Sequence, residues 1–213
     1  MSLMRLSPVS VLLALSLLLA PVGAIAHPAG EVVKDTADEV LERLRAEKEK
    51  LEQDSDQIYA LVYEMIIPHF DFEGMSKWVL GRNWRQASEE QREQFTKEFQ
   101  TLLVRTYAKA LLEYSDEEIK YSPVQKKEGA KLVKVQTEVK QSSSSNIPIN
   151  YTMHQVDGEW KVVDVSVNGV SLVSTYRGSF ASEVRRDGME GLLEKLAKRN
   201  AGSNAAVEAH ESE

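Results

Sequence analysis

The chain has 213 residues, of which 42% are hydrophobic and 28% are charged, with 11 Gly, 6 Pro and no Cys. This composition is typical of a globular protein with an apolar core, and the lack of Cys excludes a disulfide framework, a thiolate metal site, a Cys nucleophile and a lipidated Cys. The formal net charge of −7 argues against binding to nucleic acid, because proteins that bind nucleic acid carry a basic surface.

The first 26 residues have the layout of a secretory signal peptide. Arg5, the one charged residue of this segment, is followed by the apolar run Val9–Ala20, by Pro21 and by the small-residue sequence Ala24-Ile25-Ala26. A membrane anchor needs about 20 apolar residues in a row, and this run is shorter. We therefore expect cleavage after Ala26 and export of a soluble protein to the bacterial periplasm.

Apolar residues at helical spacing predict four helices in the first half of the exported chain. His27–Lys34 is expected to be a short leader, and the capping box Thr36-x-x-Glu39 to open the first helix. A proline ends the second helix, a glycine ends the third, and Ser88 with Gln91 opens the longest. The four predicted helices cover residues 36–52, 56–68, 72–80 and 88–112.

The spacing of apolar residues then changes from 3.6 to 2, which predicts β-strands. We expect strands over Ile119–Ser122, Val133–Val139, Ile147–Met153 and Trp160–Val167, with a hairpin turn at Asp157-Gly158 and a hairpin loop at Ser142–Ser145. In the last strand Val162 shares the phase of Trp160, whereas Val163 shares the phase of Val165. This change of phase predicts a β-bulge, or burial on both faces, near residues 162–163.

Helical spacing returns over Leu172–Arg186 and Met189–Arg199, on either side of Gly188, and residues 201–213 are expected to form a disordered tail. This order of elements indicates a single α+β domain over residues 27–200, with helices packed on one face of a curved antiparallel sheet of about four strands. A curved sheet closed by the wide apolar face of the long helix can enclose a cavity.

The sequence offers little that resembles a catalytic or metal site. None of the histidines, which are His27, His69, His154 and His210, has a metal-ligand partner at helical or strand spacing. His69 lies near Glu64, Asp71 and Glu73, which allows a carboxylate–histidine site but favours a solvated helix junction. Ser171 lacks the second glycine of a nucleophile elbow and is expected to cap the following helix. We expect no catalytic residue, no metal and no cofactor.

Six segments of the chain, taken together, resemble the MlaC family, also called toluene-tolerance auxiliary proteins. The segments are VLGRNWRQAS at Val79–Ser88, QREQFTKEF at Gln91–Phe99, LLVRTY at Leu102–Tyr107, GEWKVVD at Gly158–Asp164, GVSL at Gly169–Leu172 and Tyr176-Arg177-x-x-Phe180. The resemblance spans about residues 35–200, and such an ordered set is more specific than any one motif.

Members of this family are periplasmic phospholipid carriers. The resemblance therefore implies a shuttle that moves glycerophospholipids between an outer-membrane lipoprotein–porin complex and an inner-membrane ABC transporter complex with a lipid-binding periplasmic domain, and so maintains outer-membrane asymmetry. It also implies an NTF2-like α+β fold with a lipid cavity, a bound phospholipid as cargo, and a position for Val170 against the acyl chains. No nucleic-acid partner is implied.

The physics of such a cargo also requires an apolar cavity. Two acyl chains carry about 30 methylenes, each worth about 0.8 kcal/mol when it is kept from water. The residues expected to line the cavity are Val79, Phe95, Phe99, Leu103, Tyr107, Val133, Val135, Val139, Ile149, Tyr151, Val163, Val165, Val167, Val170, Val173 and Tyr176. Taken singly, each of them is more typical of an ordinary core residue, so the cavity assignment applies to the set.

The headgroup and the alternative functions rest on fewer residues. Arg82, Trp84 and Arg105 are candidates for headgroup contact, and each has a purely structural alternative. A second hypothesis is an NTF2-like enzyme acting on a small apolar substrate, which needs a carboxylate or a Tyr–Asp pair in the cavity. Asp164 is the one acid in the strand core, and its phase predicts a structural acceptor rather than a base. A third hypothesis is a structural domain of a transporter that binds no ligand.

Overall fold

The computed structural model of the chain describes residues 27–113, 116–125, 129–140 and 145–210. Its elements are α1 Pro28–Ala46, α2 Lys48–Gln53, α3 Ser55–Met65, the 3-10 helix η1 Ile67–His69, α4 Phe72–Leu80, α5 Arg82–Gln86, α6 Glu89–Tyr107, α7 Ala110–Glu113, β1 Glu118–Tyr121, β2 Val133–Lys140, β3 Ile147–Val156, β4 Glu159–Val167, β5 Val170–Ser171 and α8 Leu172–His210. The predicted signal peptide and most of the Ser142–Ser145 loop lie outside the described residues.

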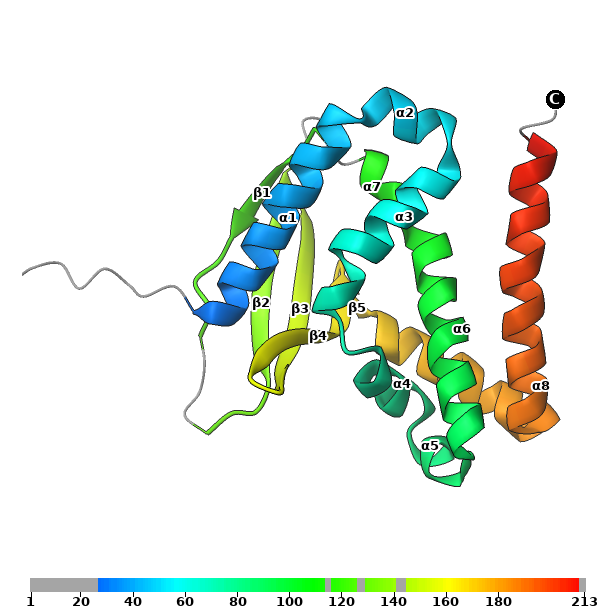
Figure 1. Cartoon of the computed structure of the whole chain (residues 1–213). Helices are drawn as coiled ribbons and strands as arrows, with labels where there is room; N and C mark the ends of the chain where they lie inside the picture. Colours follow the sequence, from blue (N-terminus) through cyan, green and yellow to red (C-terminus); the bar gives the residue numbers. More distant parts are fainter. Residues whose placement is uncertain (1–26, 114–115, 126–128, 141–144, 211–213) are drawn as a thin grey trace, which may run out of the picture.

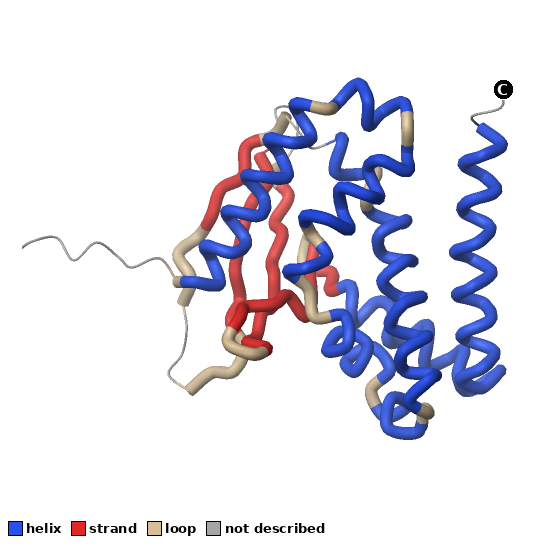
Figure 2. The backbone as a smooth tube through the Cα atoms, viewed as in Figure 1, coloured by secondary structure: helices blue, strands red, loops and turns tan. Residues whose placement is uncertain are grey.

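The predicted α+β class is confirmed. The strands form one antiparallel sheet in the order β1-β2-β3-β4-β5, and Figure 2 shows the sheet on one side of the molecule with the helices α3 to α8 on the other. The sheet has a fifth strand beyond the four expected. β5 follows a tight turn in which Asn168 and Gly169 both have positive φ, and its two residues are too few to show a strand period.

The first helix begins earlier than predicted. The segment His27–Lys34 was expected to be a leader, but α1 begins at Pro28, and the Nδ1 atom of His27 accepts a hydrogen bond of 3.1 Å from the backbone N–H of Ala29. Proline favours the first position of a helix. Ala29 and Val33 are buried against the sheet, so tertiary packing as well as capping holds this turn.

The longest helix of the first half is shorter than predicted. Its capping box is confirmed, because Ser88 and Gln91 exchange both hydrogen bonds at the start of α6. The helix ends at Tyr107 rather than at Leu112, since the N–H groups of Leu111 and Leu112 bond three residues back, to Ala108 and Lys109, in a tighter turn. The short helix α5 between Gly81 and Ala87 was not predicted.

The predicted β-bulge is present between β3 and β4. Thr152 pairs with Asp164 and Met153 pairs with Val162, so the register shifts by one residue at this point and leaves Val163 without a partner. Val162 packs in the cluster formed by α1 and the sheet, whereas Val163 packs among α4, α6 and α8. One strand therefore joins two separate parts of the core.

Helix α8 contains the break that Gly188 predicts, with φ 73° and ψ 179° at this residue. Its first half lies behind α6 and its second half runs upward beside it (Figure 1). The helix continues to His210, so helical backbone covers most of the segment for which the sequence predicted a disordered tail. Within the described part of the chain, no helix combines the length and the hydrophobicity that a membrane span requires.

Candidate functional site

The register of the sheet places the inward-facing residues in cross-strand rows, and three of these rows reach β4. The first row is Val133, Met153 and Val162; the second is Val135, Tyr151 and Val165; the third is Thr137, Ile149, Val167 and Val170. Directly opposed residues on neighbouring strands place their side chains on the same face. From β2 to β5 the sheet therefore offers one continuous face that is apolar apart from Thr137 and the Tyr151 hydroxyl.

This face is closed at one end and open at the other. The first row is buried beneath Ala29 and Val33 of α1. In the third row Val167 is 38% exposed and Val170 is 60% exposed. Large apolar side chains that remain exposed next to one another often mark a surface that binds a partner or a ligand. The open end at β4 and β5 is therefore the candidate site.

Two of the polar groups on this face are already paired within the protein. The Thr137 hydroxyl, which is 4% exposed, donates a hydrogen bond of 2.9 Å to the carbonyl of Ile149. Burial raises the pKa of Tyr151, while a hydrogen bond with Thr137 acts in the opposite direction. Thr137 was not among the predicted lining residues, although its place in the alternation of β2 was visible in the sequence.

The helices beside this face contain a closed aromatic cluster. Phe95 and Phe99 on α6 stack at 5.6 Å between ring centres, and Phe180 on α8 meets both edge-on. Tyr176, also on α8, lies 5.3 Å from Phe99. Phe95 and Phe99 are fully buried, and they contact helices rather than the open face. These aromatic side chains form a core.

The predicted lipid-binding residues fall into three groups by exposure. Buried side chains are Val79, Phe95, Phe99, Leu103, Val133, Val135, Val139, Val163 and Val173. Half-buried side chains are Ile149, Tyr151, Val165 and Tyr176, and exposed ones are Tyr107, Val167 and Val170. Six of the buried residues belong to the helical core cluster, namely Val79, Phe95, Phe99, Leu103, Val163 and Val173. The structure thus separates core from candidate site within one predicted set.

Tyr107 is an exposed aromatic side chain near the helical core. It is the last residue of α6, and Tyr176, which packs against that core, acts electrostatically on its hydroxyl. Burial, with Tyr176 as the second cause, raises the pKa of Tyr107 to about 12, although its ring is 42% exposed. The hydroxyl therefore stays protonated at neutral pH.

The three headgroup candidates lie in different surroundings. The cations of Lys77 and Arg92 lie over the ring of Trp84 on α5, at 5.8 and 5.5 Å from its centre. Arg105 stacks on Tyr59 of α3 at 5.6 Å, and its buried Nη1 atom has no hydrogen-bond partner among the described residues. Positions 105 and 107 differ by about 160° around a helix, so Arg105 and Tyr107 leave α6 on nearly opposite sides.

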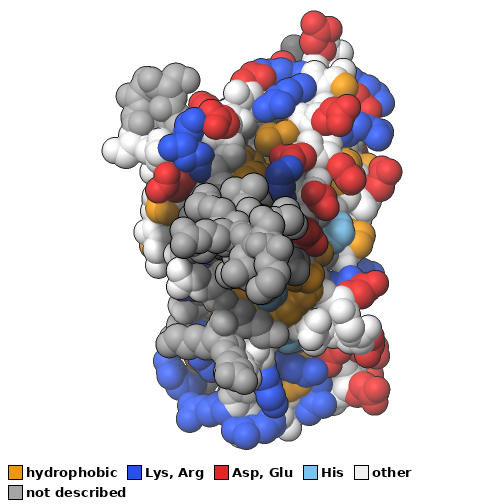
Figure 3. Space-filling view, turned by 90° about the vertical axis from the view of Figure 1, so that its left-hand side faces the viewer, with side chains coloured by type: hydrophobic (Ala, Val, Ile, Leu, Met, Phe, Trp, Pro, Cys, Tyr) orange, Lys and Arg blue, Asp and Glu red, His pale blue; other side chains and the backbone are white. Residues whose placement is uncertain are grey.

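Basic side chains gather away from the middle of the surface seen in Figure 3. That view shows hydrophobic side chains near the centre of this face and Lys and Arg side chains along its lower edge. The lower edge is at the height of α5 in Figure 1, where Arg82 and Arg85 are exposed. Arg82 is therefore a surface residue, and no hydrogen bond between described residues ties it to Trp84 or Arg105.

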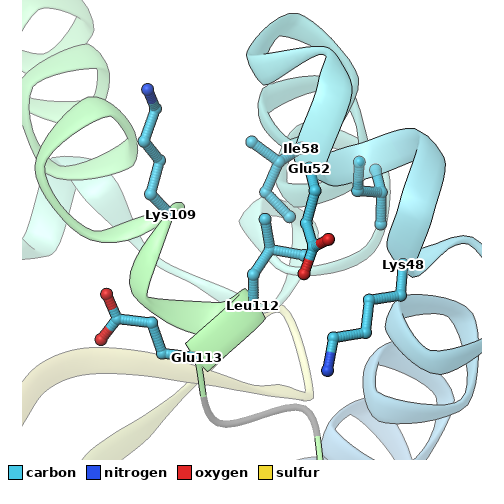
Figure 4. Close-up of a pocket in the computed structure, with 7 residues that line it drawn as sticks. Lys48, Glu52, Ile58, Lys109, Leu112 and Glu113 are labelled. Atoms are coloured by element: carbon cyan, nitrogen blue, oxygen red, sulfur yellow. The ribbon is translucent and has the colours of Figure 1, made fainter.

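Two surface pockets lie away from the open end of the sheet. The first has a volume of about 410 Å³ and lies among α2, α3 and α7, with Ile58 and Leu112 at its base and Lys48, Lys109 and Glu113 around it (Figure 4). The second, of about 490 Å³, lies between α1 and β1. Neither pocket is lined by any of the predicted lipid-binding or headgroup residues. Charged side chains surround both, which does not suit an acyl chain.

Asp164 and His154 are engaged in structural contacts. Asp164 accepts hydrogen bonds from the Ser171 hydroxyl at 2.7 Å and from the Val173 N–H at 3.1 Å. The Ser171 hydroxyl in turn accepts from the Ser174 N–H, so the predicted cap of α8 is confirmed. His154 contacts Asp71 at 2.8 Å. In the described part of the chain, no group of three or more His, Asp or Glu residues could hold a metal ion.

Comparison with known proteins decides the family. The family model described as MlaC protein matches residues 34–198. The chain belongs to the MlaC family. It is 32% identical over 159 residues to the toluene tolerance protein ttg2D of Pseudomonas putida, an overlap that covers 74% of each chain. It is 26% identical over 169 residues, or 78% of each chain, to the intermembrane phospholipid transport system binding protein MlaC of Haemophilus influenzae.

A solved structure supports the same family. The phospholipid-binding protein of Ralstonia solanacearum, determined in complex with a phospholipid, superimposes with a TM-score of 0.77 and 30% sequence identity. The match covers 84% of this MlaC chain and 99% of the Ralstonia chain. The fold of this chain is therefore the fold of a MlaC-type phospholipid-binding protein.

Proposed function

We propose that this chain is a periplasmic carrier that binds one or more glycerophospholipids and moves them between the two membranes. The observation that carries the proposal is the Ralstonia solanacearum relative, which has the same fold and holds a phospholipid. The open apolar face of this chain, with Val167 and Val170 exposed, offers a place for such a cargo. The predicted export signal at residues 1–26 supports a periplasmic location.

Within this proposal, the second and third rows of the sheet contact the acyl chains. Val135, Ile149, Tyr151, Val165 and Val167 face the same side of the sheet, and Val170 extends the third row. The buried aromatic residues of α6 act instead as the rigid wall behind the site, since they contact one another and α8. Keeping about 30 methylenes from water is worth roughly 24 kcal/mol at about 0.8 kcal/mol each, so the acyl chains must be enclosed. The helices and the sheet must therefore separate to make room for them.

The proposal assigns no catalytic role. Asp164, the acid that an enzyme of this fold would use, serves as acceptor for the Ser171 hydroxyl and the Val173 N–H. The expected partners are an inner-membrane ABC transporter complex with a lipid-binding periplasmic domain and an outer-membrane lipoprotein–porin complex. The name of the Haemophilus influenzae relative, an intermembrane phospholipid transport system binding protein, supports partners of this kind. Arg82, Trp84 and Arg105 remain candidates for headgroup contact.

The direct test is the lipid content of the exported protein. The protein is purified from the periplasm without detergent, and its intact mass is measured by native mass spectrometry. A solvent extract of the same sample is analysed for lipids. We expect a mass above that of the polypeptide and one phospholipid class, or several, in the extract. A protein that has only the polypeptide mass, and that takes up no phospholipid from vesicles, would contradict the proposal.

A further inference from the structure

The open end of the sheet is a sharp corner between β4 and α8. Asn168 and Gly169, both with positive φ, turn the chain from β4 into β5. Two residue pairs join β5 to β4, namely Ser166 with Ser171 and Val167 with Val170. A hairpin this short is not stable alone, so the place of Val170 depends on contacts beyond the sheet ladder.

The corner is apolar on one face and polar on the other. Successive residues of a strand point to opposite faces of the sheet, so Val170 continues the apolar rows, whereas Ser171 lies on the other face. Asp164 precedes Ser166 by two residues in β4 and therefore shares the face of Ser171. The exposed valines at the open end thus have polar side chains behind them.

Asp164 is the centre of this polar network. One carboxylate oxygen accepts a hydrogen bond of 2.7 Å from the Ser171 hydroxyl, and the other accepts one of 3.1 Å from the Val173 N–H. The Ser171 hydroxyl accepts one of 3.0 Å from the Ser174 N–H, and its carbonyl accepts one of 2.8 Å from the Thr175 hydroxyl. The carboxylate thus joins β4 to the end of β5 and to the first turn of α8.

This network holds Val170 in place before any ligand arrives. Hydrogen bonds to an ionised carboxylate are about twice as strong as those between neutral groups, and both Asp164 and Ser171 are half-buried. Val170 is joined covalently to Ser171 and pairs with Val167, so it cannot shift unless these bonds break. A site that is ordered in advance loses less conformational entropy when it binds.

We propose that Asp164 is a positioning residue for the candidate lipid site. Through Ser171 and Val173 it fixes the corner between β5 and α8, and with it the place of Val170 against a bound acyl chain. The inference rests on the proposed function, in which Val170 is a lipid contact. Asp164 lies on the face of the sheet away from that contact, so its removal weakens lipid binding without removing a group that touches lipid.

The test uses two substitutions at Asp164. Asp164→Ala removes both acceptor oxygens. Asp164→Asn keeps one acceptor oxygen for the Val173 N–H, and its amide N–H is able to donate to the Ser171 hydroxyl. Each exported protein is stripped of lipid and equilibrated with vesicles of dioleoyl phosphatidylglycerol. The bound lipid is measured by mass spectrometry over a range of vesicle concentrations, and urea unfolding is measured on the same samples.

Asp71→Ala is the matched control. Asp71 also accepts a backbone N–H at the start of a helix, that of Gly74 at 2.8 Å, and its other oxygen also contacts a side chain, that of His154. Its own N–H donates to the carbonyl of Val162, which places it at the closed end of the apolar face. The two alanine variants therefore remove similar contacts at opposite ends of the site.

We expect Asp164→Ala to weaken lipid binding about two- to tenfold, which corresponds to the cost of ordering roughly one side chain on binding. Asp164→Asn should restore most of the affinity. Asp71→Ala should unfold at a lower urea concentration than the wild type and still bind lipid with the wild-type affinity. This division between affinity and stability is the result that a purely structural role of Asp164 would not produce.

Three results would overturn the inference. They are unchanged affinity in Asp164→Ala, equal losses of affinity in Asp164→Ala and Asp71→Ala, and an Asp164→Asn variant as weak as Asp164→Ala, which would assign the effect to the charge. If Asp164→Ala does not fold, Ser171→Ala replaces it, because it removes the hydroxyl contact and keeps the Val173 bond. Unchanged binding by Ser171→Ala would then overturn the inference. Wild-type protein that binds no phosphatidylglycerol would instead contradict the proposed function.

Discussion

The imidazole Nε2 of His154 on β3 lies 2.8 Å from a carboxylate oxygen of Asp71, which sits between η1 and α4. The other oxygen of Asp71 accepts the N–H of Gly74 at 2.8 Å and caps α4, and the Asp71 N–H donates to the carbonyl of Val162. One residue therefore joins the start of a helix to two strands. The sequence shows only that Asp71 is close to His69 along the chain. It does not show the contacts of Asp71 with β3 and β4, because these strands begin more than 70 residues later.

Replacing Asp71 is expected to destabilise the fold. Asp71→Ala removes the cap of α4, a loss of about 1–2 kcal/mol, together with the contact to His154. Asp71→Asn keeps an acceptor for the Gly74 N–H, so it separates the two effects. Urea unfolding of both variants measures the difference. The control is Asp116→Ala, which removes an exposed ion pair with Lys48 and should leave the midpoint unchanged; an equal effect of Asp116→Ala would contradict this reading.

His69 is expected to make stability depend on pH. Burial, with the charge of Lys161 as the second cause, lowers the pKa of His69 below 6.5. Between the lowered folded value and the unfolded value of 6.5, the unfolded chain binds more protons, so stability rises with pH. The stabilising contribution is complete above about pH 6.5 and is lost as the pH falls toward the folded value.

The measurement is the free energy of unfolding in urea at pH 7.5 and pH 5.5, for the wild type and for His69→Gln. The wild type should lose more stability on acidification than the variant, because glutamine does not titrate. The difference between the two proteins cancels the other histidines and the carboxylates. Identical losses in both proteins would show that His69 does not contribute.

Phe99 is expected to matter for stability more than for cargo. It is fully buried and contacts Phe95, Tyr176 and Phe180, so Phe99→Ala should cost about 3–5 kcal/mol. Val167→Ala at the open end should change stability by no more than about 0.5 kcal/mol, because Val167 is 38% exposed. Chemical unfolding distinguishes the two. A small loss for Phe99→Ala would mean that this side chain borders a space rather than a packed core.

The contrast between Phe99 and Val167 shows where sequence reasoning stops. Helical and strand spacing identified both residues as inward-facing, and the structure agrees about the faces. What the spacing could not show is what lies opposite each face. Phe99 meets α8, which begins more than 70 residues later, whereas Val167 meets no comparable cover. The sequence therefore predicts the elements well and the division between core and site poorly.

Short residue patterns predicted some features of the fold and missed others. The capping box at Ser88, the helix Phe72–Leu80 and the bulge near Val162 were all visible as residue patterns and are confirmed. The start of α1 was missed because its evidence lies in the burial of Ala29 and Val33 against distant strands. Burial of this kind has no signature in a segment with few apolar residues.

Val170→Glu is expected to remove lipid binding without unfolding the protein. Val170 is 60% exposed in the structure, so its glutamate replacement stays hydrated in the lipid-free protein and should change the unfolding free energy by less than about 0.5 kcal/mol. Covering that carboxylate with an acyl chain is costly. Lipid content and circular dichroism are measured together, with Leu132→Glu as the control, since Leu132 is 45% exposed outside the three rows. Retention of lipid by Val170→Glu would remove Val170 from the site.

Gly188 is expected to be required for the turn within α8. Its φ of 73° and ψ of 179° lie in a region that is essentially restricted to glycine, and forcing another residue into it costs about 1–3 kcal/mol. The turn brings Leu192, Leu193 and Leu196 into the helical core cluster. Gly188→Ala should therefore destabilise the fold by at least about 1 kcal/mol, or straighten α8 and expose these leucines.

Gly178 in the first half of the same helix provides the matched control. An added Cβ meets nothing within 4 Å there, and its φ is not positive. Because alanine is the better helix former by about 1 kcal/mol, Gly178→Ala should stabilise the protein. The two substitutions are chemically identical and are predicted to have opposite signs in urea unfolding. If both raise the midpoint, α8 tolerates a straight path through residue 188, and the packing of its second half against α6 is not what holds the turn.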